Sequence, residues 1–237
     1  MAGPRWVRGF SLVELLMAIL IIGILASMLT PVMAKARLAA QQIRCVNNVR
    51  AIGIGHELFS QDHQDRVVPH GRFGHPPPGA LIPNRLITFW PDLLMADVPD
   101  ARVFKCPCHF GGPVSIGCSL GALGSYASGR SGTWLPRQHV TRPAETLLFG
   151  DAGFISPATA VHLDADAWRE DPTVSYDPFS IRMPTDPYFA RVLSRLVNRH
   201  LSKATVGFVD GHAESTAASR MGFHLPWGHL ANRWDTS

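Results

Sequence analysis

An apolar run near the start of the chain constrains its structure most. From Leu12 to Leu29 the sequence contains one charged residue, Glu14, and one small polar residue, Ser27. A helix of this length would extend about 27 Å, close to the ~30 Å hydrocarbon core of a bilayer. Charges, prolines and glycines interrupt every later apolar run. The sequence therefore predicts one membrane crossing at most, with everything after about Ala34 in water.

The acid inside this run needs a partner. An ionised carboxylate in apolar surroundings is costly unless it is paired. No Lys, Arg or His lies within two helical turns downstream of Glu14, and Arg8 upstream lies too close to the membrane surface. If the chain were cut between Gly9 and Phe10, the new α-amine would lie four residues before Glu14, about one helical turn away. The two groups could then pair, within one molecule or between staggered neighbouring helices.

The segment Gly9-Phe10-Ser11-Leu12-Val13-Glu14-Leu15-Leu16 resembles the recognition motif of type IV prepilins and of the pseudopilins of type II secretion. The resemblance implies a leader of residues 1–9, cleavage after Gly9, and N-methylation of Phe10 by an inner-membrane prepilin peptidase. It also implies that Glu14 pairs with the amine of Phe10 in an adjacent subunit during filament assembly. Pro31 falls where such proteins often carry a helix-kinking proline.

Two other interpretations of this segment remain open. It could be a conventional secretory signal peptide, although the acid and the weak cleavage context around Ala34-Lys35-Ala36 disfavour this. It could also be a plain N-terminal anchor whose Glu14 reaches toward the interface.

The helix is expected to continue beyond the membrane. Apolar side chains recur at helical spacing on one face, whereas charged and polar ones occupy the other. We predict one helix from about Ser11 to about Ser60, bent near Pro31. The expected organisation is a leader (1–9), a transmembrane and assembly helix (10–32), and an exported globular domain (33–237). The apolar positions are Leu38, Cys45, Val46, Val49, Ile52 and Phe59.

Two later segments have strand character. They are Glu145–Asp151 and Ala204–Ser215, and in the second Asp210-Gly211 is a strong hairpin signal. A Pro- and Asp-rich stretch without periodicity, roughly 155–186, lies between them. The sequence thus predicts an α+β, pilin-like fold, with a long N-terminal helix packed on a small antiparallel sheet with irregular loops.

The spacing around the second strand segment extends the resemblance. Nine residues separate His200 from Asp210-Gly211. This is similar to the ending of a pseudopilin-like family that is named for its His, nine residues, Asp-Gly. His200, Asp210 and His212 could cluster as metal ligands or as a base with its orienting group. The simpler interpretation is that Asp210 shapes the turn.

The four cysteines allow several arrangements. If the domain is exported, disulfides are permitted, and Cys45–Cys106 with Cys108–Cys118 is the favoured pairing. Zinc at Cys106, Cys108, His109 and Cys118 is an alternative, as is calcium in the acidic stretch. The main expectation is that the protein binds no metal and no cofactor.

The sequence favours a structural role over catalysis. A net charge of +4 without a Lys/Arg block gives no support for nucleic-acid binding, and no phosphate loop or paired-carboxylate motif is present. We expect no enzyme but a pilin or pseudopilin subunit, with prepilin peptidase, other pilin-like subunits, an inner-membrane assembly platform and lipid as partners. Arg5 and Arg8 predict a cytoplasmic N-terminus and a periplasmic or extracellular domain. The alternative is a membrane-anchored binding protein or enzyme.

Overall fold

The computed structural model describes residues 11–109, 111–120, 134–174, 176–225 and 228–234. The chain divides into two compact units, Met1–Ala40 and Gln41–Ser237. Helix α1 (Leu12–Asp62) contributes to both, so the long helix predicted from the apolar run and the stripe is confirmed. Pro31 lies inside this helix. The bend expected near Pro31 stays a prediction.

The first unit consists, in its described part, of the apolar end of α1. Every side chain from Leu12 to Met33 is exposed, including Ile19, Ile22 and Leu25. Among the described residues, α1 is the one helix long and apolar enough to cross a membrane. The structure thus agrees with a single N-terminal membrane anchor.

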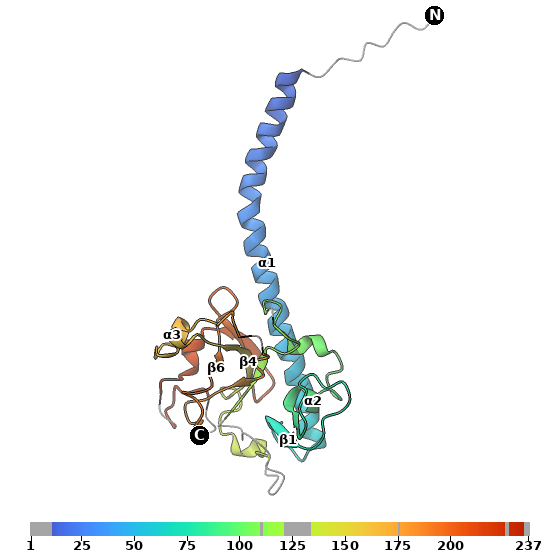
Figure 1. Cartoon of the computed structure of the whole chain (residues 1–237), viewed down its shortest axis with the longest axis vertical. Coiled ribbons are helices and arrows are strands. Elements are labelled where there is room, and N and C mark those ends of the chain that lie inside the picture. Colours follow the sequence, from blue (N-terminus) through green and yellow to red (C-terminus); the bar gives the residue numbers. More distant parts are fainter. Residues whose placement is uncertain (1–10, 110, 121–133, 175, 226–227, 235–237) are drawn as a thin grey trace, which may run out of the picture. The chain divides into compact units, whose positions relative to one another are not determined.

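The second unit is built on a six-stranded sheet with the order β5-β3-β4-β7-β8, in which β6 also pairs with β4. Strand β4 lies at the centre (Figure 1) and pairs antiparallel with β3, β6 and β7. One pair, β3 with β5, is parallel, so the sheet is mixed although mostly antiparallel. The strands are β3 (Ile116–Ser119), β4 (Leu147–Phe154), β5 (Ser180–Ile181), β6 (Ser194–Leu196), β7 (Ala204–Phe208) and β8 (Ala213–Thr216).

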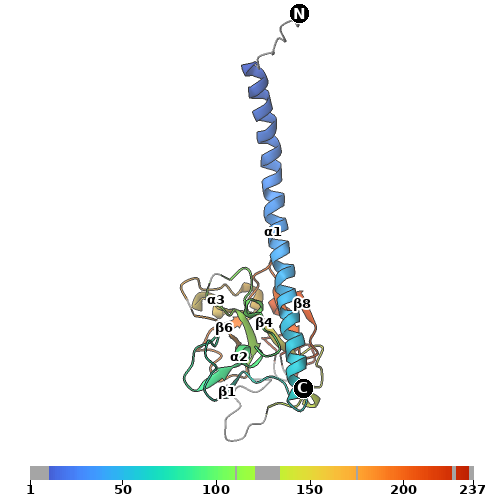
Figure 2. The same ribbon diagram turned by 90° about the vertical axis from the view of Figure 1, so that its right-hand side faces the viewer.

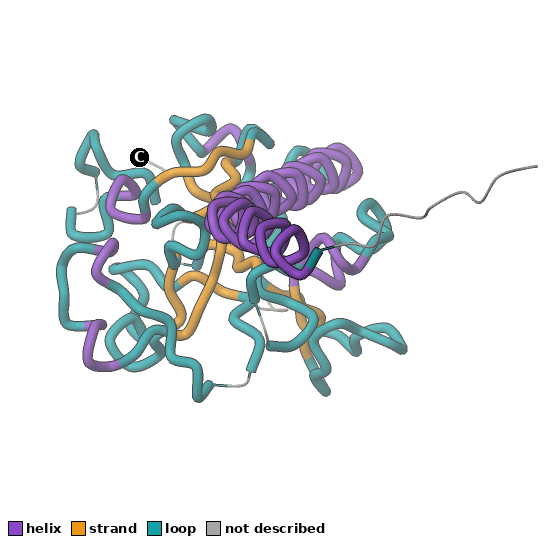
Figure 3. Tube along the Cα trace, turned by 90° about the horizontal axis from the view of Figure 1, so that it is seen from above, coloured by secondary structure: helices purple, strands orange, loops and turns teal. Residues whose placement is uncertain are grey.

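Short elements and loops surround this sheet, as Figure 3 shows. A separate antiparallel pair joins β1 (Gly71–Phe73) to β2 (Ile87–Phe89). The helices besides α1 are α2 (Trp90–Leu93) and α3 (Pro157–Ala160), and the 3₁₀ turns are η1 (Ala101–Phe104), η2 (Arg137–His139), η3 (Ala165–Ala167) and η4 (Ala218–Met221).

One face of the sheet packs against the 41–62 part of α1. Most of the predicted stripe supplies this contact: Cys45, Val49, Ile52 and Phe59 are buried and Val46 is half-buried, whereas Leu38, which was expected in the stripe, is exposed. Gln42 donates a hydrogen bond to Ser215 of β8, at 2.5 Å between Nε2 and Oγ, and Figure 2 shows β8 beside this part of the helix. Period-3.6 apolar positions therefore meet the pleated surface of the sheet.

The opposite face packs in a second apolar cluster. Alternate residues of β7, Ala204, Val206 and Phe208, belong to it, as expected for a strand whose side chains alternate between faces. Trp234 near the C-terminus is also buried there. Both faces of β7 are thus covered, which explains why its five residues are all buried.

The stretch 155–186 is not a peripheral insertion. It contributes β5 to the sheet and places Ile155, Trp168, Ile181 and Met183 in the second apolar cluster. Its lack of periodicity has a simple cause: most of it is loop, in which single apolar residues dip into the core at irregular intervals.

Candidate functional site

The acid singled out from the sequence caps the first turn of α1. Ser11 precedes the helix, and its backbone N–H donates a hydrogen bond to Glu14 Oε2 at 3.0 Å. Ser11 and Glu14 stand at the N-cap and N3 positions, which is the spacing of a capping box. Glu14 therefore satisfies an N-terminal backbone donor of α1 within its own chain.

The cap gives Glu14 a local role that the sequence interpretation missed. The signal was present, since Ser11-Leu12-Val13-Glu14 has the S-x-x-E pattern before an apolar run. Gly9 and Phe10, the residues of the expected cleavage, lie outside the described residues. The pairing of Glu14 with the amine of Phe10 stays a prediction.

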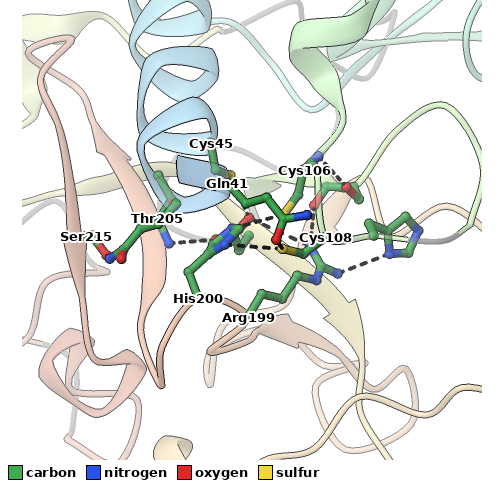
Figure 4. Close-up of polar contacts among 12 residues, drawn as sticks. Gln41, Cys45, Cys106, Cys108, Arg199, His200, Thr205 and Ser215 are labelled. Atoms are coloured by element: carbon green, nitrogen blue, oxygen red, sulfur yellow. Dashed lines mark hydrogen bonds and ion pairs between the residues drawn. The ribbon is translucent and has the colours of Figure 1, made fainter. Parts of the chain in front are cut away.

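A buried polar cluster lies where α1 meets the sheet within the second unit. The potential ligand atoms of Cys45, Cys106, Asp151 and His200 all lie within 4.8 Å of one another. Cys45 comes from α1, Cys106 follows η1, Asp151 lies in β4, and His200 precedes β7. Figure 4 shows the two cysteines and the imidazole converging. These elements are far apart in the sequence, so only the folded chain assembles the cluster.

Short contacts join the four side chains. Cys106 Sγ lies 3.1 Å from His200 Nε2, and the Cys45 thiol donates to Asp151 Oδ1 at 3.2 Å. Asp151 Oδ2 lies 3.6 Å from His200 Nε2 and accepts a hydrogen bond from the backbone N–H of Thr205 at 2.7 Å. Asp151 is 0% and His200 1% exposed, so water does not compete for these contacts.

A buried cation lies next to the cluster. Arg199 Nη1 is 3.8 Å from Asp151 Oδ1, and Nη2 pairs with Glu170 Oε1 at 2.5 Å. His109 Nδ1 lies 3.5 Å from the same oxygen of Glu170. Glu170 belongs to the stretch 155–186, which thus supplies a counter-charge for Arg199.

The environment shifts the ionisation of the cluster. The hydrogen bond from Cys45, and next to it the one with His200, lower the pKa of Cys106 to about 4, although burial opposes this. The same hydrogen bond to Cys106, burial and the Asp151 charge raise the pKa of Cys45. Burial raises the pKa of Asp151 to about 7, and the charge of Cys106 adds to this. Without a cation at its centre, the cluster therefore favours one thiolate, on Cys106.

Two residue sets suggested by sequence spacing are not gathered by the fold. Of the suggested zinc set, Cys106 lies in the cluster, but His109 turns to Glu170, and the Cys118 thiol donates to the Ser119 carbonyl at 3.7 Å. Cys118 sits in β3 and is held by its strand in the core.

The suggested trio of His200, Asp210 and His212 also separates. Asp210 Oδ1 lies 2.6 Å from His212 Nδ1 and accepts from the His212 backbone N–H at 3.1 Å. Asp210 thus shapes the turn between β7 and β8, and His200 makes its contacts in the buried cluster instead.

Asp151 was missed as a site residue. Its signal was an acid in the middle of an apolar strand, which normally requires a buried partner. All four cysteines, each in a described part of the chain, are free thiols in the structure. Cys45 and Cys106 face one another, and their disulfide, like the pairing of Cys108 with Cys118, stays a prediction.

Two acids of the stretch 155–186, Asp166 and Asp186, have partners within the chain. Asp166 accepts from Asn198 Nδ2 at 2.7 Å and from Ser219 Oγ at 2.6 Å. Asp186 pairs with Arg182 at 2.6 Å. These contacts assign structural roles to the acids, and calcium binding there stays untested.

Comparison with known proteins agrees with the N-terminal segment. The family model described as "Prokaryotic N-terminal methylation motif" matches residues 7–30. No curated protein and no solved structure matches the chain.

The motif, the exposed apolar helix and the α+β domain are together consistent with an α+β, pilin-like fold. More particularly, the N-terminal methylation motif overlaps the one helix of the described residues that is long and apolar enough to cross a membrane.

Proposed function

We propose that this protein is a structural subunit, a pilin or pseudopilin, of a type IV pilus-like or type II secretion-like filament. In this proposal prepilin peptidase cleaves the chain between Gly9 and Phe10 and methylates the new amine. The observation that carries the proposal is the methylation motif over residues 7–30. Processing at this motif removes the leader from the apolar helix. Its removal prepares the helix to pack against the helices of other subunits.

The exposed helix supports a role in assembly. Between Leu12 and Met33 large apolar side chains point outward on all sides, for example Val13 at 65% and Ile22 at 63% exposure. Such a surface is stable only in lipid or against other apolar helices. Packing it against neighbouring subunits would replace lipid contacts with helix contacts when a subunit leaves the bilayer.

Glu14 would then set the register of the helices. Inside a bundle of apolar helices its carboxylate gains most from a cation, and the N-methylated amine of Phe10 on an adjacent subunit supplies one. The capping bond to Ser11 holds the Glu14 carboxylate at the start of the helix.

Further elements of the proposal concern location and subfamily. The N-terminus would be cytoplasmic and the domain periplasmic or extracellular, with the assembly platform and other subunits as partners. The spacing of His200 from Asp210-Gly211 would place the chain in the pseudopilin-like subfamily with that ending. It is supported by Gly211 having φ +88°, a conformation that favours glycine.

A second candidate is a membrane-anchored ectodomain that works as a single copy and binds a ligand or catalyses a reaction. The buried cysteine–histidine–aspartate cluster favours it, because burying such polar groups costs free energy that a purely structural core would not need to spend.

The test begins with the mature N-terminus. Mass spectrometry of the full-length gene product from its native membrane should find a chain that begins with N-methyl-Phe10. Gly9→Glu should leave residues 1–9 in place, whereas Gly3→Glu, which adds the same charge to the leader, should allow cleavage. The processed chain should then pellet with sheared filaments. A working protein that keeps its first nine residues, or that stays a single copy in the membrane, would refute the proposal.

A further inference from the structure

The geometry of the buried cluster matches the coordination shell of a metal ion. Around a tetrahedral Zn²⁺ with sulfur, nitrogen and oxygen ligands, the donor atoms stand roughly 3.3 to 3.8 Å apart. Here His200 Nε2 lies 3.1 Å from Cys106 Sγ and 3.6 Å from Asp151 Oδ2, and no pair of ligand atoms exceeds 4.8 Å. Shifts of a few tenths of an ångström to about one ångström would bring all four donors to bonding distance.

We propose that Cys45, Cys106, Asp151 and His200 form a binding site for one Zn²⁺ ion that joins helix α1 to the sheet. The donor set is two thiols, one imidazole and one carboxylate, all buried. Thiolates and imidazole select zinc over calcium and magnesium, which take oxygen ligands.

Contacts around the cluster orient the donors, as the outer shell of a metal site does. The backbone N–H of Thr205 holds the Asp151 carboxylate at 2.7 Å. Ser115 Oγ accepts from the Cys106 backbone N–H at 2.8 Å. His200 presents Nε2 to the cluster, while its Nδ1 lies 3.5 Å from Cys108 Sγ (Figure 4). Cys108 is therefore placed to accept the Nδ1–H that a zinc-bound imidazole would carry.

A dication would also offset most of the negative charge of the deprotonated donors. Two thiolates and a carboxylate carry three negative charges, Zn²⁺ carries two positive ones, and Arg199 Nη1 lies 3.8 Å from Asp151 Oδ1. Zinc binds thiols and carboxyl groups in their deprotonated forms, so its binding should release protons to solvent and strengthen as the pH rises.

A cavity lies one side chain away from the cluster. It has a volume of about 470 Å³ and is lined in part by Cys108, His109 and Glu170. Cys108 Sγ lies 3.5 Å from His200 Nδ1, on the side of the imidazole that faces away from the proposed ion.

A Cys45–Cys106 disulfide is the alternative to a metal ion at this site. It would form the S–S bond by losing two electrons and two protons to an external oxidant, and it would remove both thiolates from the cluster. His200 Nε2 and Asp151 would then lose their sulfur partners in a fully buried position, which is costly. For this reason the geometry points to the metal.

The experiment uses the full-length protein, purified in detergent without reductant or chelator. Elemental analysis should find about one zinc per chain, and after chelation both Cys45 and Cys106 should react as free thiols. Replacement of zinc by Co²⁺ should produce the d–d bands of tetrahedral cobalt and the charge-transfer absorption of two thiolate ligands. Spectra without thiolate bands would overturn the proposal without any variant. So would a chain that contains no zinc and a Cys45–Cys106 disulfide.

Variants then identify the ligands. Cys106→Ser, Asp151→Asn and His200→Gln should each weaken Co²⁺ binding by at least tenfold, whereas Cys118→Ser should leave it unchanged. Cys118 is the matched control because it is an equally buried thiol outside the cluster. Unchanged binding in Cys106→Ser or His200→Gln would contradict the assignment. Circular dichroism checks that each variant is folded. If a variant does not fold, the Co²⁺ absorption spectrum of the unaltered protein still tests the proposal.

Discussion

The backbones of Gly53 and Gly211 lie in contact. A Cβ placed on Gly53 would be 2.6 Å from the carbonyl oxygen of Gly211, closer than a real Cβ approaches any atom. Gly53 lies in α1, and Gly211 forms the turn between β7 and β8. The helix and the hairpin can touch here because Gly53 has no side chain, whereas glycine at position 211 is favoured by its φ of +88°. A glycine that weakens the helix locally therefore permits its docking on the sheet.

Gly53→Ala should destabilise the domain by up to about 2 kcal/mol. Alanine favours the helix by about 1 kcal/mol, but the overpacked contact with Gly211 costs typically 1–3 kcal/mol or more. Chemical unfolding of the detergent-solubilised protein, followed by Trp fluorescence, measures the difference. Ile54→Ala on the exposed side of the same turn should change the stability by less than about 0.5 kcal/mol. A gain in stability for Gly53→Ala would contradict the contact.

Two buried histidines should make the domain sensitive to mild acid. Burial, and secondarily the charge of Arg137, lower the pKa of His56 to about 4. Burial, and secondarily the charge of Arg182, lower the pKa of His70 to about 3. The unfolded chain takes up protons near pH 6.5, but the folded chain does so only at these lower values. The free energy of unfolding should thus decrease as the pH falls from about 6.5 to about 4, by up to about 1.4 kcal/mol per pH unit for each histidine.

Variants isolate this effect from carboxyl groups that titrate in the same range. His56→Gln should reduce the slope of unfolding free energy against pH between about pH 6 and pH 4.5, by roughly 1 kcal/mol per pH unit. His162→Gln replaces an exposed histidine and should leave the slope as it is. If both variants gave the slope of the unaltered protein, His56 would not be the group responsible.

The turn that carries His200 is strained. Leu201 has φ +49° and Ser202 φ +61°, and the backbone hydrogen bonds between His200 and Lys203 close a two-residue turn. Both residues lie in the left-handed region, as in a type I′ turn, where Asn-Gly is preferred. The double change Leu201→Asn with Ser202→Gly should stabilise the domain by about 1 kcal/mol.

A second pair of substitutions at Leu201 and Ser202 tests the same turn. Leu201 is 50% exposed, so little burial is lost on its replacement. Leu201→Val with Ser202→Val, which adds branched side chains at the same two positions, should destabilise the domain by more than about 1 kcal/mol. Thermal unfolding that ranked the two pairs in the opposite order would argue against the left-handed turn.

Two substitutions at Glu14 separate its capping of the helix from its proposed ion pairing during assembly. Glu14→Gln retains an oxygen that can cap Ser11, because glutamine also serves at the N3 position, but it removes the charge. If assembly needs an ion pair, Glu14→Gln and Glu14→Ala should both be cleaved after Gly9 yet reduce filament yield about tenfold or more. If the cap alone matters, Glu14→Gln should assemble normally. Immunoblots of leader removal and quantification of sheared filaments distinguish these results.

Most of the helix and part of the sheet could be predicted from local pattern. The apolar run and the stripe from Cys45 to Phe59 indicated the extent of α1, and Asp210-Gly211 indicated the β7–β8 hairpin. The contribution of the stretch 155–186 to the core could not be predicted, because its buried residues follow no period and β5 is only two residues long. The parallel pairing of β3 with β5 was equally out of reach, since no local signal encodes which distant strand becomes a neighbour.

The bond between Ser11 and Glu14 and the membrane-length helix arise from local sequence, because residues a few positions apart interact there through helical geometry alone. The processing motif and the apolar helix are thus properties of one short segment. The buried cluster is of another kind, because its residues meet only after the domain has folded. Cys45, Cys106, Asp151 and His200 are separated by 61, 45 and 49 positions along the chain. Their meeting depends on the docking of α1 and on strand register, which arise from packing of the whole domain and not from any short segment.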